Sequence, residues 1–100
     1  MGWLILKMIS ILSNEKCCFF CKTTIGLHKH HIFFGANRKK SDKDGCWVYL
    51  CAKHHNMSDK SVHFDRNLDL LLKKKCEQVW IDYYGKSKEE FRKRYGKNYL

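Results

Sequence analysis

The sequence predicts a small α+β domain, in which two short strands come first and a pair of helices follows. Residues 26–34 and 47–50 are rich in β-branched and aromatic side chains, which favour strands. After residue 65, apolar side chains recur at helical spacing. Cysteine and histidine pairs flank the strand segments, and a bound metal ion would stabilise a chain of only 100 residues. We therefore expect one domain, with an N-terminal arm or strand at 1–16, a metal-containing core at 17–64 and a helical extension at 65–100.

The helical extension has clear start and stop signals. Asp65 is a favourable N-cap for a first helix, and Gly85 is a favourable residue just after its end. Ser87 begins the pattern Ser-Lys-Glu-Glu, a capping box that predicts a second helix ending near Tyr95. Phe91 and Tyr95 are four residues apart, so both are expected to pack on the first helix.

Two other segments are predicted from composition. Residues 35–45 are polar and basic, which is typical of a loop. Residues 3–12 are apolar but interrupted by Lys7, and they are shorter than the roughly 20 residues of a membrane-spanning helix. The residues that follow are a poor signal-peptide cleavage site. We expect a core strand or packing arm here, in a soluble, cytoplasmic protein without a membrane partner.

Two pairs of metal-binding residues have the spacing of a zinc site. Cys18 and Cys21 form a Cys-x₂-Cys pair, and Cys51 and His54 form a second pair about thirty residues later. Four such ligands can occupy the corners of a tetrahedron around structural Zn²⁺. Cys17 could replace Cys18, but its x₃ spacing fits a zinc knuckle less well. The other interpretations are a disulfide scaffold, or buried cysteines with a surface histidine.

Further histidines remain outside that set. His30, His31, His55 and His63 are candidates for a second centre, since imidazole is both a metal ligand and a base near neutral pH. Neutral imidazoles bind Mn²⁺ or Zn²⁺ more readily than Mg²⁺, which prefers oxygen. The alternative is a second structural zinc site made by His30, His55 and His63. His28 belongs to no pattern and is expected at the surface or facing DNA.

The order of these motifs resembles the HNH endonucleases of the His-Me finger (ββα-metal) superfamily. The resemblance covers about residues 17–63. It consists of the first cysteine pair, His30-His31-Ile32, the second pair, and His55 directly after that pair. The segment from His30 to Ser41 and the ending Gly-Lys-Asn-Tyr-Leu further resemble phage recombination-enhancement, RecA-dependent nucleases.

The resemblance implies a zinc-stapled ββα-metal core and a metal-dependent DNA endonuclease or nickase of phage recombination or DNA processing. In that family, His31 corresponds to the general base that deprotonates water. His30 and His55 correspond to ligands of one catalytic Mg²⁺ or Mn²⁺ ion, with His63 as a further candidate. The expected partners are DNA and a recombinase filament.

One position departs from the family pattern. The family's middle asparagine, which positions the loop or the base histidine, falls on Cys46. A thiol is only a weak hydrogen-bonding group and cannot reproduce an amide. Asp44, Asp42, Asn37 or a backbone carbonyl are the possible substitutes. The departure sustains an alternative function, that of a catalytically inactive, zinc-containing DNA-binding or recombination accessory module.

The charge is consistent with a nucleic-acid partner. The chain has 20 Lys and Arg against 10 Asp and Glu, a formal net charge of +10. Three basic runs contribute to it, namely Arg38-Lys39-Lys40, 73–75 and 92–94. Each run alone is typical of a solvated surface, but beside a nuclease core they are expected to contact phosphates. The first run, between the two strand segments, is the strongest candidate.

Overall fold

The computed structural model describes residues 9–56 and 61–100 and has the predicted α+β class. The elements are β1 (Leu27–His31), the 3₁₀ helix η1 (Gly35–Asn37), α2 (Arg38–Lys43), β2 (Trp47–Cys51), α3 (Ala52–His55), α4 (Arg66–Tyr84) and α5 (Lys88–Tyr95). Both strands and both C-terminal helices lie where the sequence predicts them. The division into arm, core and extension stays a prediction.

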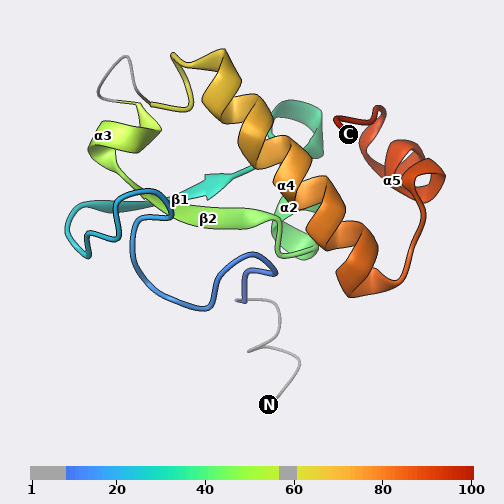
Figure 1. The fold of residues 1–100 in the computed structure, drawn as a ribbon, viewed down its shortest axis with the longest axis horizontal. Coiled ribbons are helices and arrows are strands. Elements are labelled where there is room, and N and C mark those ends of the chain that lie inside the picture. Colours follow the sequence, from blue (N-terminus) through green and yellow to red (C-terminus); the bar gives the residue numbers. More distant parts are fainter. Residues whose placement is uncertain (1–8, 57–60) are drawn as a thin grey trace.

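The two strands pair antiparallel in a single two-stranded sheet, and α3 follows β2 without a linker (Figure 1). In this register Leu27 lies opposite Cys51, and His31 lies opposite Trp47. The helix α3 contacts both strands. The chain therefore contains a β-β-α unit, in which one end of the sheet meets the short helix that carries His54 and His55.

The prediction of a loop at 35–45 is wrong, because this segment contains η1 and α2. A tertiary contact explains the difference. Ser41 of α2 is fully buried, accepts a hydrogen bond from the backbone N–H of Phe33 at 3.2 Å and donates to the carbonyl oxygen of Cys46. These bonds fix a short helix that its six mostly charged residues do not predict alone.

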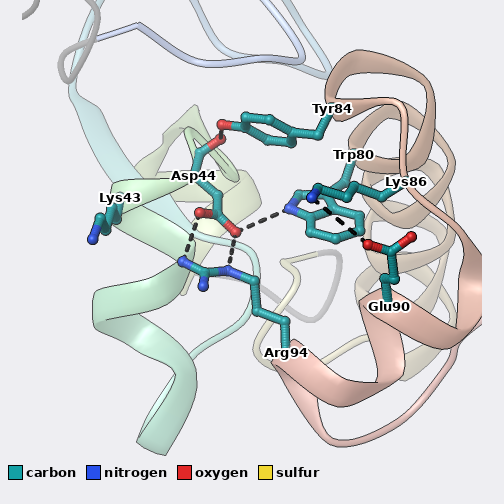
Figure 2. A pocket seen from close by; sticks show the side chains of 7 residues that line it. All are labelled: Lys43, Asp44, Trp80, Tyr84, Lys86, Glu90 and Arg94. Atoms are coloured by element: carbon teal, nitrogen blue, oxygen red, sulfur yellow. Dashed lines mark hydrogen bonds and ion pairs between the residues drawn. The ribbon is translucent and has the colours of Figure 1, made fainter.

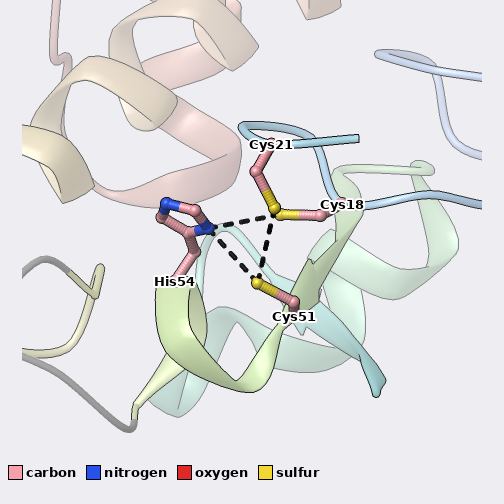
Figure 3. Close-up of side chains that lie close together, drawn as sticks. All are labelled: Cys18, Cys21, Cys51 and His54. Atoms are coloured by element: carbon pink, nitrogen blue, oxygen red, sulfur yellow. Dashed lines mark hydrogen bonds between the residues drawn. The ribbon is translucent and has the colours of Figure 1, made fainter. Parts of the chain in front are cut away.

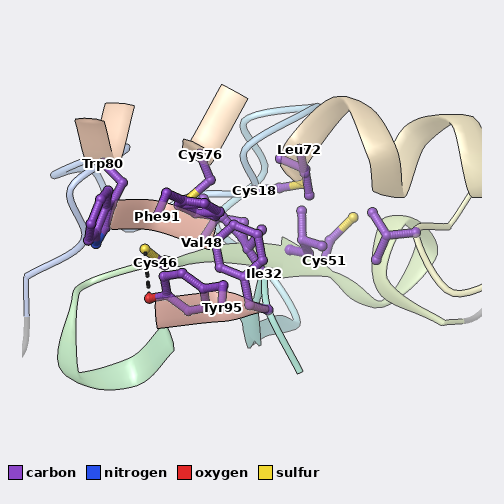
Figure 4. Packing of buried hydrophobic residues seen from close by; sticks show 13 residues of the cluster. Cys18, Ile32, Cys46, Val48, Cys51, Leu72, Cys76, Trp80, Phe91 and Tyr95 are labelled. Carbon is purple, nitrogen blue, oxygen red and sulfur yellow. Dashed lines mark hydrogen bonds between the residues drawn. The ribbon is translucent and has the colours of Figure 1, made fainter. Parts of the chain in front are cut away.

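The hydrophobic core lies between the sheet and the C-terminal helices (Figure 4). Leu72, Cys76 and Trp80 follow one another at helical spacing on α4, and all three are buried. The ring of Phe91 packs edge-on against Trp80, with 5.3 Å between ring centroids. Tyr95 is also buried, so the predicted packing of α5 on α4 is confirmed. Cys76 is a small core residue.

The ends of the two long helices also agree with the sequence. The Asp65 side chain accepts hydrogen bonds from two backbone N–H groups in the first turn of α4. Ser87 and Glu90 form the predicted capping box of α5. Gly85 and Gly96 end the helices with φ of 61° and 89°, a conformation that favours glycine.

The first eight residues lie outside the described part of the chain, so the prediction for residues 3–12 can be checked only at residues 9–12. There the chain packs as an arm instead of pairing as a strand: Ile11 donates its backbone N–H to the Gly45 carbonyl at 2.9 Å. Gly45 has φ of 75°, and a side chain there would come within 2.7 Å of the Ile9 carbonyl oxygen. Among the described residues, no helix is long and apolar enough to cross a membrane.

Candidate metal centre

The four residues of the predicted zinc site lie together (Figure 3). Ligand atoms of Cys18, Cys21, Cys51 and His54 are all within 4.8 Å of one another. His54 Nδ1 is 3.6 Å from Cys18 Sγ and 3.2 Å from Cys51 Sγ, and the sulfurs of Cys21 and Cys51 are 3.7 Å apart. Three sulfurs and one imidazole nitrogen at these separations can hold a metal ion and suit tetrahedral coordination.

Local backbone bonds form the first half of this cluster. The N–H of Cys18 donates to the Thr23 carbonyl at 2.8 Å, and the N–H of Lys22 donates to the Cys18 carbonyl at 2.9 Å. Phe19 then donates its N–H to Tyr49 of β2 at 2.9 Å. The knuckle is thereby attached to the strand whose last residue is another member of the cluster.

The electrostatics of the cluster favour a thiolate at Cys18. Burial raises the pKa of this thiol, but hydrogen bonds from the backbone of Cys21, Cys51 and Phe20 outweigh it and lower the pKa to about 6. Burial raises the pKa of Cys51. A bound cation would offset that effect, since coordinating thiols are deprotonated. Cys17, the alternative ligand, stands outside the cluster with its sulfur 3.9 Å from a Glu15 carboxylate oxygen.

A second cluster contains His30, His55 and His63, one ring nitrogen of each lying within 4.8 Å of the others. His55 Nε2 and His63 Nε2 are 3.2 Å apart. His30 is only 3% exposed, and its Nε2 has no hydrogen-bond partner among the described residues. A buried nitrogen without a partner, facing two further imidazoles, fits a metal ligand. The cluster can therefore hold a metal ion.

The lowered pKa values of His30 and His55 favour neutral imidazoles, which suits metal binding. Burial, followed by the charges of His55 and His63, lowers the pKa of His30 to about 3. Burial and the neighbouring imidazoles His63 and His28 also lower the pKa of His55. Neutral imidazole is the form that coordinates metals.

His28 lies next to the histidine cluster. The sequence predicts it at the surface or facing DNA and does not predict this contact. It is exposed, yet its Nδ1 lies 3.0 Å from His55 Nδ1, so His28 and His63 flank opposite nitrogens of one ring. The signal in the sequence was the strand itself, because alternate residues of a strand share a face, and His28 and His30 are two apart on β1. A hydrogen-bond partner on the second ring nitrogen orients a metal-ligating histidine, and His28 occupies that place beside His55.

An open pocket of about 460 Å³ brings the histidines together with the neighbouring basic residues. It is lined by Lys29, His30, His31, Phe34, Gly35, Arg38, His55 and His63. His31 is adjacent in sequence to the buried His30, and its Nε2 is 3.0 Å from a carboxylate oxygen of Asp42. The pocket thus combines candidate metal ligands, a histidine outside the metal cluster and a guanidinium group.

The three residues of the basic run Arg38-Lys39-Lys40 differ in whether they can contact a ligand. Arg38 lines the pocket, and Lys39 is exposed. Lys40 instead donates to the backbone carbonyl of Arg94 at 2.9 Å. Arg94, from the third basic run, forms an ion pair with Asp44. Two residues expected to contact phosphate therefore make contacts within the protein.

Cys46, which the resemblance aligns with an asparagine, is a core residue. Cys46 is fully buried, and the Tyr95 hydroxyl lies 3.7 Å from its sulfur. The candidate substitutes have separate partners: Asn37 donates to the Tyr95 carbonyl at 2.9 Å, Asp44 binds Arg94, and Asp42 contacts His31. Among the three, Asp42 is the side chain that reaches a histidine of the pocket.

Comparisons with protein families, with curated proteins and with solved structures give no match to this chain.

Proposed function

We propose that this protein is a metal-dependent DNA endonuclease or nickase of the HNH type, acting in phage recombination or DNA processing. The observation that carries the proposal is the pocket where His30, His31, His55 and His63 meet beside Arg38. The antiparallel strands followed directly by α3 support it, because the ββα-metal core has this order of elements. The separate Cys₃His cluster matches the structural Zn²⁺ site that the resemblance implies.

His31 is the general base of the proposed reaction. It takes a proton from water, whose oxygen bonds to phosphorus while the phosphorus bond to the leaving oxygen breaks. Histidine suits this role because its ordinary pKa is near neutral. Arg38 supplies a guanidinium that can bind phosphate oxygens through two N–H groups.

The nitrogens of His30, His55 and His63 would hold the divalent cation. When bound, Mg²⁺ or Mn²⁺ supplies Lewis-acid stabilisation of the negative charge that develops on the phosphate. An all-nitrogen donor set favours Mn²⁺ over Mg²⁺. We therefore expect stronger activity in Mn²⁺.

The alternative function is an inactive DNA-binding or recombination accessory module. Cys46 favours this alternative, because a buried thiol stands at the position where the family has an amide side chain. A second structural zinc ion at His30, His55 and His63 would favour it as well.

The deciding experiment is cleavage of supercoiled plasmid by purified protein in Mg²⁺ or Mn²⁺. We expect nicking that EDTA and His31→Ala abolish and that Tyr83→Ala retains, since Tyr83 is exposed and does not line the pocket. Zinc content is measured on the same preparations. DNA binding without cleavage of plasmid, single-stranded or recombinase-coated DNA would establish the accessory module instead, and two tightly held zinc ions per chain would favour it.

A further inference from the structure

One carboxylate oxygen, Asp42 Oδ1, lies between two residues of β1. It is 2.6 Å from Lys29 Nζ and 3.0 Å from His31 Nε2. Asp42 belongs to α2, which packs against β1. The His31 side chain is 14% exposed, whereas that of Asp42 is 49% exposed. The carboxylate is therefore on the outer side of the contact, and it does not line the histidine pocket.

The chemistry of this contact determines where the hydrogen atom resides. The hydrogen bond from Lys29 lowers the pKa of Asp42, so the carboxylate is ionised and can only accept. A favourable contact with His31 Nε2 then requires the hydrogen to be on Nε2. A neutral imidazole carries one N–H, so the lone pair of His31 is left on Nδ1.

We propose that Asp42 is the positioning residue for His31: it fixes the Nε2–H tautomer and leaves Nδ1 as the atom that accepts the proton from water. This inference rests on the proposed function in one respect, the use of His31 as the base. Asp42 thereby serves in place of the amide that is missing at Cys46, and it brings a negative charge that an amide lacks.

Other charged groups near His31 do not replace this contact. Lys29 and Arg38 have no acceptor atoms, and His30 and His55 belong to the metal cluster. Lys29 has a distinct role: its ammonium binds the same oxygen and lies 4.5 Å from the Trp47 ring centroid, which holds the carboxylate in place.

The test is NMR spectroscopy of the imidazole nitrogens in the full-length, zinc-loaded protein, through long-range ¹H–¹⁵N correlations. We expect His31 as the Nε2–H tautomer in the wild type and in Asp42→Asn, whose side-chain oxygen still accepts. In Asp42→Ala we expect a mixture of tautomers. Asp82→Ala removes an equivalent charge from an exposed site on α4 and serves as the matched control.

Cleavage kinetics provide the second readout. Asp42→Ala is expected to lower kcat on the order of 10-fold or more with little change in KM, and Asp42→Asn to restore part of the loss. A wild-type His31 with its hydrogen on Nδ1, or an unchanged tautomer in Asp42→Ala, would overturn the proposal. The wild-type spectrum alone can overturn the proposal, so the proposal can be tested even if a variant folds poorly. If the tautomers behave as expected but no variant cleaves DNA, the nuclease function fails and the assignment of Asp42 as the partner that fixes the His31 tautomer stands.

Discussion

The buried carboxylate of Asp44 joins the segment before β2 to the last helix through the guanidinium of Arg94. Arg94 Nη2 lies 2.7 Å from Asp44 Oδ1, and Trp80 Nε1 donates to Asp44 Oδ2 at 2.9 Å (Figure 2). The Tyr95 hydroxyl also donates to Asp44 Oδ2, at 2.7 Å. Tyr84 donates to the Asp44 carbonyl oxygen at 2.7 Å. One residue therefore connects α4, α5 and the end of α2, the helix that carries both Arg38 and Asp42.

Replacing Asp44 is expected to destabilise the whole domain. Asp44→Ala leaves buried donors of Trp80 and Tyr95 without an acceptor and Arg94 without its counter-charge, which we expect to cost about 3 kcal/mol of unfolding free energy. Urea unfolding followed by circular dichroism measures the loss. Lys43 is exposed and lines, with Asp44 and Arg94, a pocket separate from the histidine pocket, and Lys43→Ala should stay within about 0.5 kcal/mol of the wild type. Equal stability of the two variants would contradict the role of Asp44.

Loss of one cysteine is expected to remove the structural metal. Cys51→Ser should lower the zinc content from about one ion per chain to near zero at micromolar free metal and unfold much of the domain, because thiolate ligands dominate affinity at such sites. Cys17→Ser, which changes a cysteine outside the cluster, should keep the metal. Atomic absorption on dialysed protein compares them. Zinc loss in Cys17→Ser together with zinc retention in Cys18→Ser would show that Cys17, and not Cys18, is the ligand.

The contact between His28 and His55 predicts an effect on the second metal. His28→Ala is expected to weaken Mn²⁺ binding by roughly 10-fold, as removal of an orienting partner commonly does. His63→Ala should weaken binding further, because it removes a proposed ligand. Isothermal titration of the zinc-loaded protein measures both affinities. An unchanged affinity in His28→Ala would show that this contact does not orient His55.

The basic run should divide into residues with different effects on DNA. Arg38→Ala is expected to reduce kcat/KM by at least 10-fold, since its side chain lines the pocket. Lys39→Ala, with the same loss of charge at an exposed site, should mainly weaken affinity and reduce its salt dependence by about one counterion. Binding measured by fluorescence anisotropy over a range of salt, together with cleavage rates, separates the two. Equal losses would assign both residues to general charge attraction.

The features that could be predicted from the sequence depend on local patterns. Caps such as Asp65, the helical periodicity and the spacing of Cys18 and Cys21 concern residues close in the chain. The α2 helix was missed because it depends on a tertiary contact of Ser41 with Phe33. The partners of Asn37, Asp42 and Asp44 could not be predicted either. These three polar residues lie in one segment, and tertiary packing alone gives each of them a different partner.

The adjacency of His54 and His55 on α3 has a consequence for how the protein acquires its metals. One residue belongs to the Cys₃His cluster and the next to the three-histidine cluster, on a helix of only four residues. Such a helix is too short to be stable alone, so its orientation depends on the ion that holds His54. We expect an obligatory order of loading, in which the cysteine cluster is filled first and the histidine cluster forms afterwards. By thermodynamic reciprocity, an ion in the histidine cluster would raise the affinity of the neighbouring cysteine cluster for zinc.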